Sequence, residues 1–340
     1  MMSMRAIVQE RYGVPDEVLH LRETEIPKPG PGQVLVRVRA ASVHPDVWHV
    51  ITGYPRLLRL MGAGLRRPKQ PIPGTDMAGE VEAVGCDVTR FATGDAVFGE
   101  THLQSQWVNG GTYAEYVCAP EDVLSLLPEG ITFEQAATVP TAGMIAVNNL
   151  RDHIWTRPGQ RILINGAAGG VGSIAIQMAK ANGATVVAVD HTTKLDFMRS
   201  LGADEVIDYT RQDITESKNR FDLIADVAST LSFPHCKRLL EADGTYVIIG
   251  HDHYGKKGRR TLGGTPYFFG LMVRALFDRH LPKPSFETMK KRDAMEILCR
   301  MLKSGQLSPT VAKAFPLAEV PSAIQCLQAG QLCGRIVILP

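Results

Sequence analysis

The stretch Arg161-Ile-Leu-Ile-Asn-Gly-Ala-Ala-Gly-Gly-Val-Gly172, followed by Ser173-Ile-Ala-Ile-Gln-Met-Ala-Lys180, decides the fold. Residues 161–165 form a short apolar run typical of a buried parallel strand, and residues 173–182 have the spacing of an amphipathic helix. Small residues in the turn between them let the backbone approach a pyrophosphate held at a helix N-terminus. The turn is therefore predicted to bind a dinucleotide through Ala167, Gly169, Gly170, Val171 and Gly172.

The strand–helix alternation continues after this turn. Residues 184–190 form a second apolar run ending at Asp190, about 20 residues on, where the dinucleotide motif places an acid. Apolar runs at 205–209, 221–227 and 245–250 follow, separated by helical patterns at 197–201 and 231–240. This alternation predicts a doubly wound parallel sheet covered on both faces. Ligands bind beyond the carboxyl ends of such strands, so Asp190, Val227 and Gly250 are expected near the nucleotide.

The N-terminal part has a different pattern. From Met4 to about residue 135, short β-branched runs such as 34–40 and 79–85 are separated by proline and glycine. Many short strands with turn signals predict an antiparallel β barrel or sandwich. A last strand at 334–339 is expected to return to this domain. The predicted organisation is a β-rich domain at 1–140, with a C-terminal return at 307–340, and a dinucleotide-binding domain at 141–306.

Composition excludes several classes of function. The chain has 340 residues and a formal net charge of +2, which gives no electrostatic case for a nucleic-acid partner. Its six cysteines are scattered without a C-x-x-C pair, as in reduced intracellular proteins. The N-terminus lacks a charged-then-apolar leader, and no apolar run approaches the roughly 18 residues that span a bilayer. We therefore expect a cytoplasmic protein without a transmembrane segment.

Eight motifs in fixed order carry a family resemblance. They are Ala41-Ser-Val-His-Pro-Asp46, Pro71-Ile-Pro-Gly-Thr-Asp76, Phe91-x-x-Gly-Asp-Ala-Val-Phe98, Gly110-Gly-Thr-Tyr-Ala-Glu-Tyr116, Val139-Pro-Thr-Ala-Gly143, the turn ending at Gly172, Leu201-Gly-Ala-Asp204 and Gly334-Arg-Ile-Val337. In these motifs the chain resembles the medium-chain dehydrogenase/reductases, specifically the zinc-independent quinone oxidoreductase-like branch. The resemblance implies a GroES-like β-rich catalytic domain, a Rossmann domain, and a homodimer formed edge to edge between Rossmann sheets.

The same comparison argues against zinc, which needs three protein ligands in a catalytic site. Zinc-using relatives place cysteine at His44, histidine within Gly74-Thr75-Asp76, and a second cysteine near Thr141; only His44 is still able to bind a metal in that role. The four-cysteine structural zinc loop is also missing, because residues 99–111 contain no cysteine. Without a Lewis acid, hydride transfer from reduced nicotinamide to a lipophilic quinone or α,β-unsaturated carbonyl is the expected reaction, since hydrogen-bond donors stabilise the charge on its oxygen.

Site residues follow from the resemblance. Thr141 matches the position beside the nicotinamide ribose and ring, although a helix N-cap is an equal alternative. Gly250 and Gly334 match backbone positions that line the nicotinamide end. His44 stands where the branch most often has asparagine, so it is a candidate donor to a substrate carbonyl or a structural residue. Tyr54 is a candidate proton donor at the mouth of the cleft.

The signals for cofactor preference are split. Asp190 is expected to bond a ribose diol and repel a 2′-phosphate. Lys194 and Tyr209 match the family positions that hold the 2′-phosphate. We expect a modest preference for NADPH over NADH.

Two other functions and one further feature stay open at this point. The alternatives are a zinc-type alcohol dehydrogenase with a site rebuilt around His44, and a nucleotide-binding redox-sensing protein with little catalysis. Two basic, apolar segments, 54–69 and 252–285, are either exposed basic surface over a core or subunit-contact helix, or a cap over the substrate pocket. As a cap, their apolar side chains would face the substrate, and the basic ones would face water, an anionic tail or a membrane.

Overall fold

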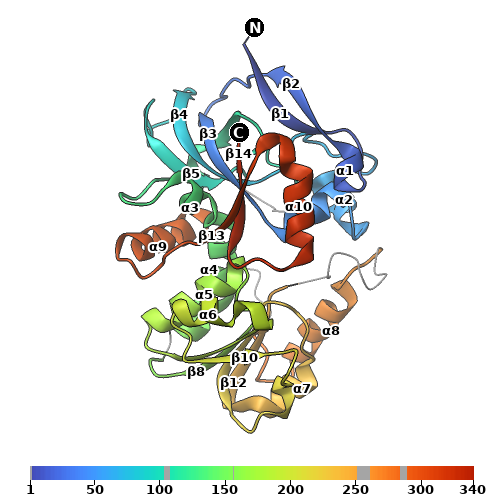
Figure 1. The fold of residues 1–340 in the computed structure, drawn as a ribbon, viewed down its shortest axis with the longest axis vertical. Coiled ribbons are helices and arrows are strands. Elements are labelled where there is room, and N and C mark those ends of the chain that lie inside the picture. The colour runs from blue at the N-terminus through green and yellow to red at the C-terminus, as the bar shows by residue number, and fades with distance from the viewer. Residues whose placement is uncertain (1, 103–107, 156, 251–260, 284–288) are drawn as a thin grey trace. The chain divides into compact units, whose positions relative to one another are not determined.

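The structure is a computed structural model that describes residues 2–102, 108–155, 157–250, 261–283 and 289–340 (Figure 1). It divides into two units, Met1–Met144 with Lys290–Pro340, and Ile145–Met289. Helix α9 (Lys291–Lys303) belongs to the first unit, whereas the sequence-based boundary at 306 assigned it to the second. The reason is packing: α9 contacts β7 (Leu124–Leu126), and its Leu298 lies against Gly143. No helix in the described part of the chain is long and apolar enough to cross a bilayer.

The second unit contains the predicted parallel sheet. Its strand order is β10-β9-β8-β11-β12, and every neighbouring pair is parallel. The strands are β8 (Arg161–Asn165), β9 (Thr185–Asp190), β10 (Glu205–Asp208), β11 (Phe221–Asp226) and β12 (Leu240–Ile248). The chain order reverses between β8 and β11, which makes the carboxyl ends of these two strands the topological switch point.

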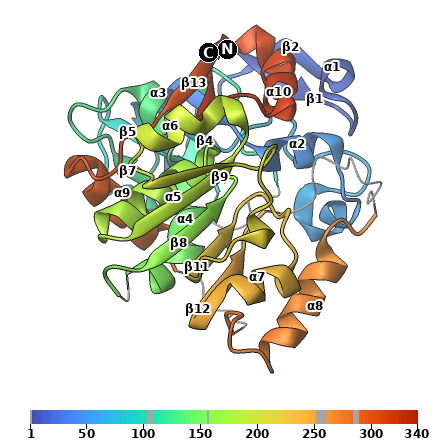
Figure 2. The same ribbon diagram turned by 60° about the horizontal axis from the view of Figure 1, so that its bottom comes forward.

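The helices of this unit are short and follow the strands. They are the C-terminal part of α4 (Pro140–Ile154), α5 (Gly170–Ala181), α6 (Leu195–Ser200), α7 (Phe233–Leu239) and α8 (Thr265–Ala275) (Figure 2). The strands read as continuous apolar runs because side chains on both faces are buried. Leu163, Val187 and Ile224 lie in one cluster with side chains of α7 and α8. The alternate positions Ile162, Val186 and Ala225 are buried as well. The predicted fold class of this region is confirmed.

The first unit is built on a seven-stranded sheet. Its main path is β13-β14-β3-β4-β5-β7, with β6 (Tyr116–Pro120) also paired to β3. The remaining bounds are β13 (Val311–Pro316), β14 (Arg335–Leu339), β3 (Gln33–Val43), β4 (Asp76–Val84) and β5 (Ala96–Glu100). A separate antiparallel pair is formed by β1 (Ser3–Gln9) and β2 (Leu19–Glu25). Helices α1 (Pro15–Val18), α2 (Pro45–Thr52), α3 (Phe133–Ala137), α9 and α10 (Val320–Ala329) complete the unit.

The C-terminal strand returns to the first unit, as predicted. β14 pairs antiparallel with β3, placing Val337 opposite Ser42. β13 pairs in parallel with the other edge of β14. The sheet is therefore assembled from both ends of the chain, and Arg335 at the start of β14 is carried into its interior.

Candidate functional site

The glycine turn forms the first turn of α5, which begins at Gly170 rather than at the predicted Ser173. Gly169 is the extended N-cap residue, and its carbonyl accepts the Ser173 N–H at 2.8 Å. The N–H groups of Gly170, Val171 and Gly172 lie in the first helical turn, where no intrahelical acceptor exists. This is an arrangement that accepts an anionic group.

The glycines of the turn differ in the space around them. A Cβ at Gly172 would lie 2.3 Å from the Gly166 carbonyl oxygen and 2.7 Å from the Ala167 Cα, so only glycine allows this close backbone approach. A Cβ at Gly169 would find its nearest neighbour at 3.5 Å. Gly172 therefore closes the turn, while Gly169 leaves open space beside it. The residues present fit a bound pyrophosphate.

The Asp190 carboxylate holds the glycine turn through hydrogen bonds to backbone N–H groups. Its Oδ2 accepts the Ala168 N–H at 3.0 Å, and its Oδ1 accepts the His191 N–H at 2.8 Å. Lys194 Nζ lies 3.1 Å from Asp190 Oδ1, and both side chains are buried. The carboxylate is therefore a structural acceptor whose charge Lys194 balances. The half-exposed Tyr209 follows β10, where its ring meets the edge of the His191 ring at 6.0 Å between centroids.

A polar group at the switch point was missed by sequence reasoning. The carboxylate of Asp226, at the end of β11, accepts hydrogen bonds from Asn165 Nδ2 at 2.7 Å, from the Tyr246 hydroxyl at 3.0 Å and from the Leu231 N–H at 3.0 Å. Burial raises the pKa of Asp226, and these hydrogen bonds oppose the rise. The group ties β8 to β11 at the edge where a ligand binds. The sequence did contain a signal for this group, because a polar residue ends each of two neighbouring strands: Asn165 in β8 and Asp226 in β11.

Gly250 and Gly334 both occupy positions that exclude a side chain. A Cβ at Gly250 would lie 2.2 Å from the Val227 carbonyl oxygen. Gly334 has a φ of 84°, and its Cβ would meet the Thr310 carbonyl oxygen at 2.6 Å. At both positions, neighbouring backbone atoms therefore leave no room for a Cβ, so only glycine fits.

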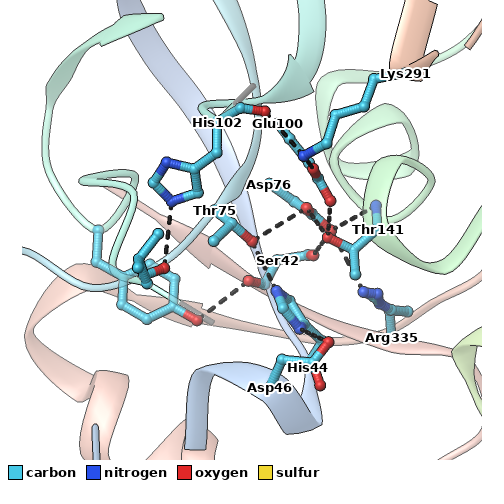
Figure 3. Close-up of polar contacts among 12 residues, drawn as sticks. Ser42, His44, Asp46, Thr75, Asp76, Glu100, His102, Thr141, Lys291 and Arg335 are labelled. Atoms are coloured by element: carbon cyan, nitrogen blue, oxygen red, sulfur yellow. Dashed lines mark hydrogen bonds and ion pairs between the residues drawn. The ribbon is translucent and has the colours of Figure 1, made fainter. Parts of the chain in front are cut away.

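The first unit contains a buried polar cluster around Asp76 and Thr141, which we call the acid cluster (Figure 3). The Thr141 hydroxyl contacts Asp76 Oδ1 and lies 2.6 Å from Glu100 Oε1. Lys291 pairs with the other oxygen of Glu100 and also donates to the His102 carbonyl at 2.8 Å. Arg335 Nη2 lies 3.3 Å from Asp76 Oδ2, which also accepts the Ser42 hydroxyl at 3.1 Å. Two buried acids are thus balanced by two cations.

The two contacts of the Thr141 hydroxyl depend on whether one of the neighbouring carboxyl groups is protonated. A hydroxyl donates one proton, so both contacts of Thr141 are hydrogen bonds only when one of the two carboxyls is protonated. Burial raises the pKa of Glu100; the charge of Lys291 opposes this rise and that of Asp76 adds to it. Burial thus favours the protonated form of Glu100, whereas the Lys291 ammonium beside it favours the carboxylate. Thr141 lies inside the first turn of α4 and bonds these side chains, so the N-cap alternative is wrong.

His44 lies beside the acid cluster, between two polar neighbours. Its Nε2 is 2.8 Å from the Thr75 hydroxyl, and its Nδ1 is 3.5 Å from Asp46 Oδ2. The side chain is buried at the start of α2. Tyr54 follows the end of α2, with its ring 5.9 Å from the Arg59 guanidinium carbon.

The donor set here does not match a zinc site. Thr75 and Thr141 occupy the positions where zinc relatives were expected to have histidine and cysteine. Throughout the described residues, no three His, Cys, Asp or Glu side chains are grouped to hold a metal ion.

Comparisons with known proteins cover both units. Residues 30–129 match the alcohol dehydrogenase GroES-like domain, and residues 201–338 match the zinc-binding dehydrogenase family. The chain is 30% identical over 349 residues to the chloroplastic quinone-oxidoreductase QR1 of Triphysaria versicolor, covering 99% of this chain and 98% of that one. It is 29% identical to the chloroplastic NADPH-dependent alkenal/one oxidoreductase of Arabidopsis thaliana, over 99% and 80% of the two chains. The solved quinone oxidoreductase of Coxiella burnetii superposes with a TM-score of 0.82 at 26% identity, over 100% of both chains.

Proposed function

The chain belongs to the medium-chain dehydrogenase/reductase superfamily, in its quinone oxidoreductase-like branch, and we propose that it is an NAD(P)H-dependent reductase of quinones and α,β-unsaturated carbonyls. The observation that carries this proposal is the Gly172 turn, where the backbone leaves no room for a Cβ and the first helical N–H groups are open to an anion. Relatives named as quinone and alkenal/one oxidoreductases support the substrate class.

We assign cofactor binding to the second unit and substrate binding to the first. Ala167, Gly169, Gly170, Val171 and Gly172 would hold the pyrophosphate, with Asp190 fixing the turn through the Ala168 N–H. When bound, reduced nicotinamide supplies the hydride. Thr141, Gly250 and Gly334 are proposed to lie beside the nicotinamide end.

His44 is the proposed donor to the substrate carbonyl oxygen, where negative charge develops. Its ring is held between Thr75 and Asp46, so a substrate oxygen would replace one of these two partners. Tyr54 is proposed as a second donor. Because these residues supply hydrogen bonds rather than a metal, the proposed reaction is zinc-independent.

The proposed preference for NADPH rests on Lys194 and Tyr209. The Asp190 carboxylate, from which the sequence predicts repulsion of a 2′-phosphate, is held by two backbone N–H groups and by Lys194. An acid neutralised in this way does not oppose a 2′-phosphate as an unpaired one does. The NADPH-dependent relative from Arabidopsis thaliana supports the same preference.

We also propose a homodimer and a cytoplasmic location. β12 is an edge strand of the five-stranded sheet, and an edge strand presents N–H and C=O groups to a second copy. The thiols of Cys86, Cys118, Cys236, Cys299 and Cys326 are free, which fits a reducing compartment.

The test is a screen of quinones, enones and alcohols with NADPH and NADH, using the purified protein. We expect oxidation of NADPH in the presence of quinones or enones. Oxidation of simple alcohols with NAD(P)⁺, lost on treatment with a chelator, would contradict the proposal and favour a zinc-type alcohol dehydrogenase. Nucleotide binding without turnover of any acceptor would favour the redox-sensing protein.

A further inference from the structure

Helix α8 has two apolar faces, although a helix on a protein surface needs only one. Leu271 and Ala275 are buried in the core cluster of the second unit. On the other side, Phe269 is 65% exposed, Met272 44%, Val273 45%, Leu276 67% and Phe277, just after the helix, 88%. We call these five residues the α8 apolar face. A contiguous apolar surface of this kind marks an interaction site.

The surroundings of the α8 apolar face are basic. Between residues 261 and 283 the chain carries Arg274, Arg279 and Lys283 but a single acid, Asp278. Asp278 is paired with Lys237 of α7, whose Nζ lies 2.6 Å from the carboxylate. Helices α7 and α8 are neighbours (Figure 2). A groove of about 370 Å³ lies between them and is lined by Phe233, Pro234, Lys237, Arg274, Phe277 and Asp278.

We propose that the α8 apolar face docks on the surface of an anionic lipid bilayer. An amphipathic helix lies in the bilayer interface when its apolar side chains reach the acyl boundary and its basic residues meet anionic headgroups. Phe269, Leu276 and Phe277 would enter the interface. Arg274, in the groove between α7 and α8, would contact a lipid phosphate.

Charge argues against a second copy of the chain as the occupant. A two-fold contact would place two patches of the same positive net charge against each other, because the described residues of this patch include four cations, Lys237, Arg274, Arg279 and Lys283, and two acids, Asp278 paired with Lys237 and Asp243 paired with Arg279. Bilayer docking instead pairs these cations with phosphates. Segment 54–69 carries exposed apolar residues of its own on the first unit, and the proposal does not use them.

The experiment measures sedimentation of the full chain with phosphatidylcholine vesicles that contain or lack phosphatidylserine, at low ionic strength. We expect binding to the phosphatidylserine vesicles. The double variant Leu276→Ser/Phe277→Ser should lose at least about tenfold in partition coefficient, equal to about 1.4 kcal/mol. Arg274→Gln should lose about fivefold, equal to about 1 kcal/mol per basic residue at an anionic surface.

The matched control is Leu126→Ser/Val84→Ser, which removes two apolar side chains that are 55% and 39% exposed on the first unit. The control should retain wild-type partition, and thermal melting should show that every variant is folded. Absent binding of the wild type, equal binding to both vesicle types, or unchanged partition of the double variant would each overturn the proposal. So would conversion of a wild-type dimer to a monomer by the double variant with vesicle binding unchanged, because the occupant would then be a second copy.

Turnover of a short, water-soluble quinone is measured in parallel. Vesicle binding without any turnover would remove the proposed function and leave the docking surface supported. If the Leu276→Ser/Phe277→Ser variant, without vesicles, lost turnover of long-tailed quinones but kept turnover of the short one, docking would be overturned in favour of a cap over the substrate.

Discussion

Replacing Gly172 and Gly169 separately with alanine distinguishes the two roles of the glycine turn. At Gly172 the new Cβ would lie 2.3 Å from the Gly166 oxygen, so backbone atoms must move by about 1 Å to reach ordinary contact near 3.5 Å. Overpacking of this kind costs about 1–3 kcal/mol, and the better helix propensity of alanine returns up to about 1 kcal/mol. We expect a net loss of roughly 1–2 kcal/mol, or about 1–3 °C in Tm for a chain of 340 residues.

At Gly169 the outcome should be the opposite. The residue has a φ of −76°, and the nearest atom to a new Cβ is 3.5 Å away, so Gly169→Ala should melt like the wild type. The methyl group instead occupies space on the side where a pyrophosphate approaches, and NADPH affinity in a fluorescence titration should fall at least about tenfold, or 1.4 kcal/mol. Wild-type affinity in folded Gly169→Ala, or an unchanged Tm in Gly172→Ala, would refute this account of the turn.

Three further predictions follow from the ion pairs and the donor set. Lys194→Ala should weaken NADPH affinity about tenfold more than NADH affinity, because only NADPH presents a 2′-phosphate to a charged hydrogen-bond donor. Asp190→Asn keeps an acceptor for the Ala168 N–H and removes the carboxylate that pairs with Lys194, so it should raise NADPH affinity by freeing that cation for the 2′-phosphate. Equal effects of Lys194→Ala on both cofactors would contradict the assignment. Elemental analysis should find no stoichiometric zinc, and one zinc per chain with chelator-sensitive activity would reverse this expectation. The pKa of Glu100 is raised in the folded protein. The stability linked to this shift is complete below the unfolded pKa of about 4.3 and is lost as pH rises through the folded pKa. Glu100→Gln should therefore flatten the decline in the free energy of unfolding, measured in urea, over that pH window, and equal slopes in the two proteins would show that Glu100 holds no proton.

Local patterns predicted the parts of the fold that depend on local sequence. The apolar run at 161–165 and the glycines after it define β8 and the turn regardless of distant partners, and the structure places both there. The return of β14 was predictable because a strand after the doubly wound pattern lacked a partner. The end of that domain was not predictable: α9 is amphipathic, and its sequence does not say whether it covers β7 or the parallel sheet.

The acid cluster shows why site residues are harder to predict than strands. Asp76, Glu100, Thr141, Lys291 and Arg335 come from five separate segments, and no spacing relates them. Thr141 was identified by resemblance, but its contacts with the carboxyl groups of Asp76 and Glu100 arise only from tertiary packing. Asp226 illustrates the same limit, since a strand-final acid carries no signal until β8 and β11 become neighbours.

The pairing of β14 with β3 has a consequence for how the chain is made. The second unit is one continuous segment, so it is able to fold as soon as it leaves the ribosome, whereas the first unit needs both ends of the chain. Until β14 is synthesised, the side of β3 that pairs with it, from Ala41 to Val43, has no strand beside it. The nascent chain therefore carries an open, aggregation-prone edge through most of its translation, and its protection by chaperones during that interval should limit the yield of native protein.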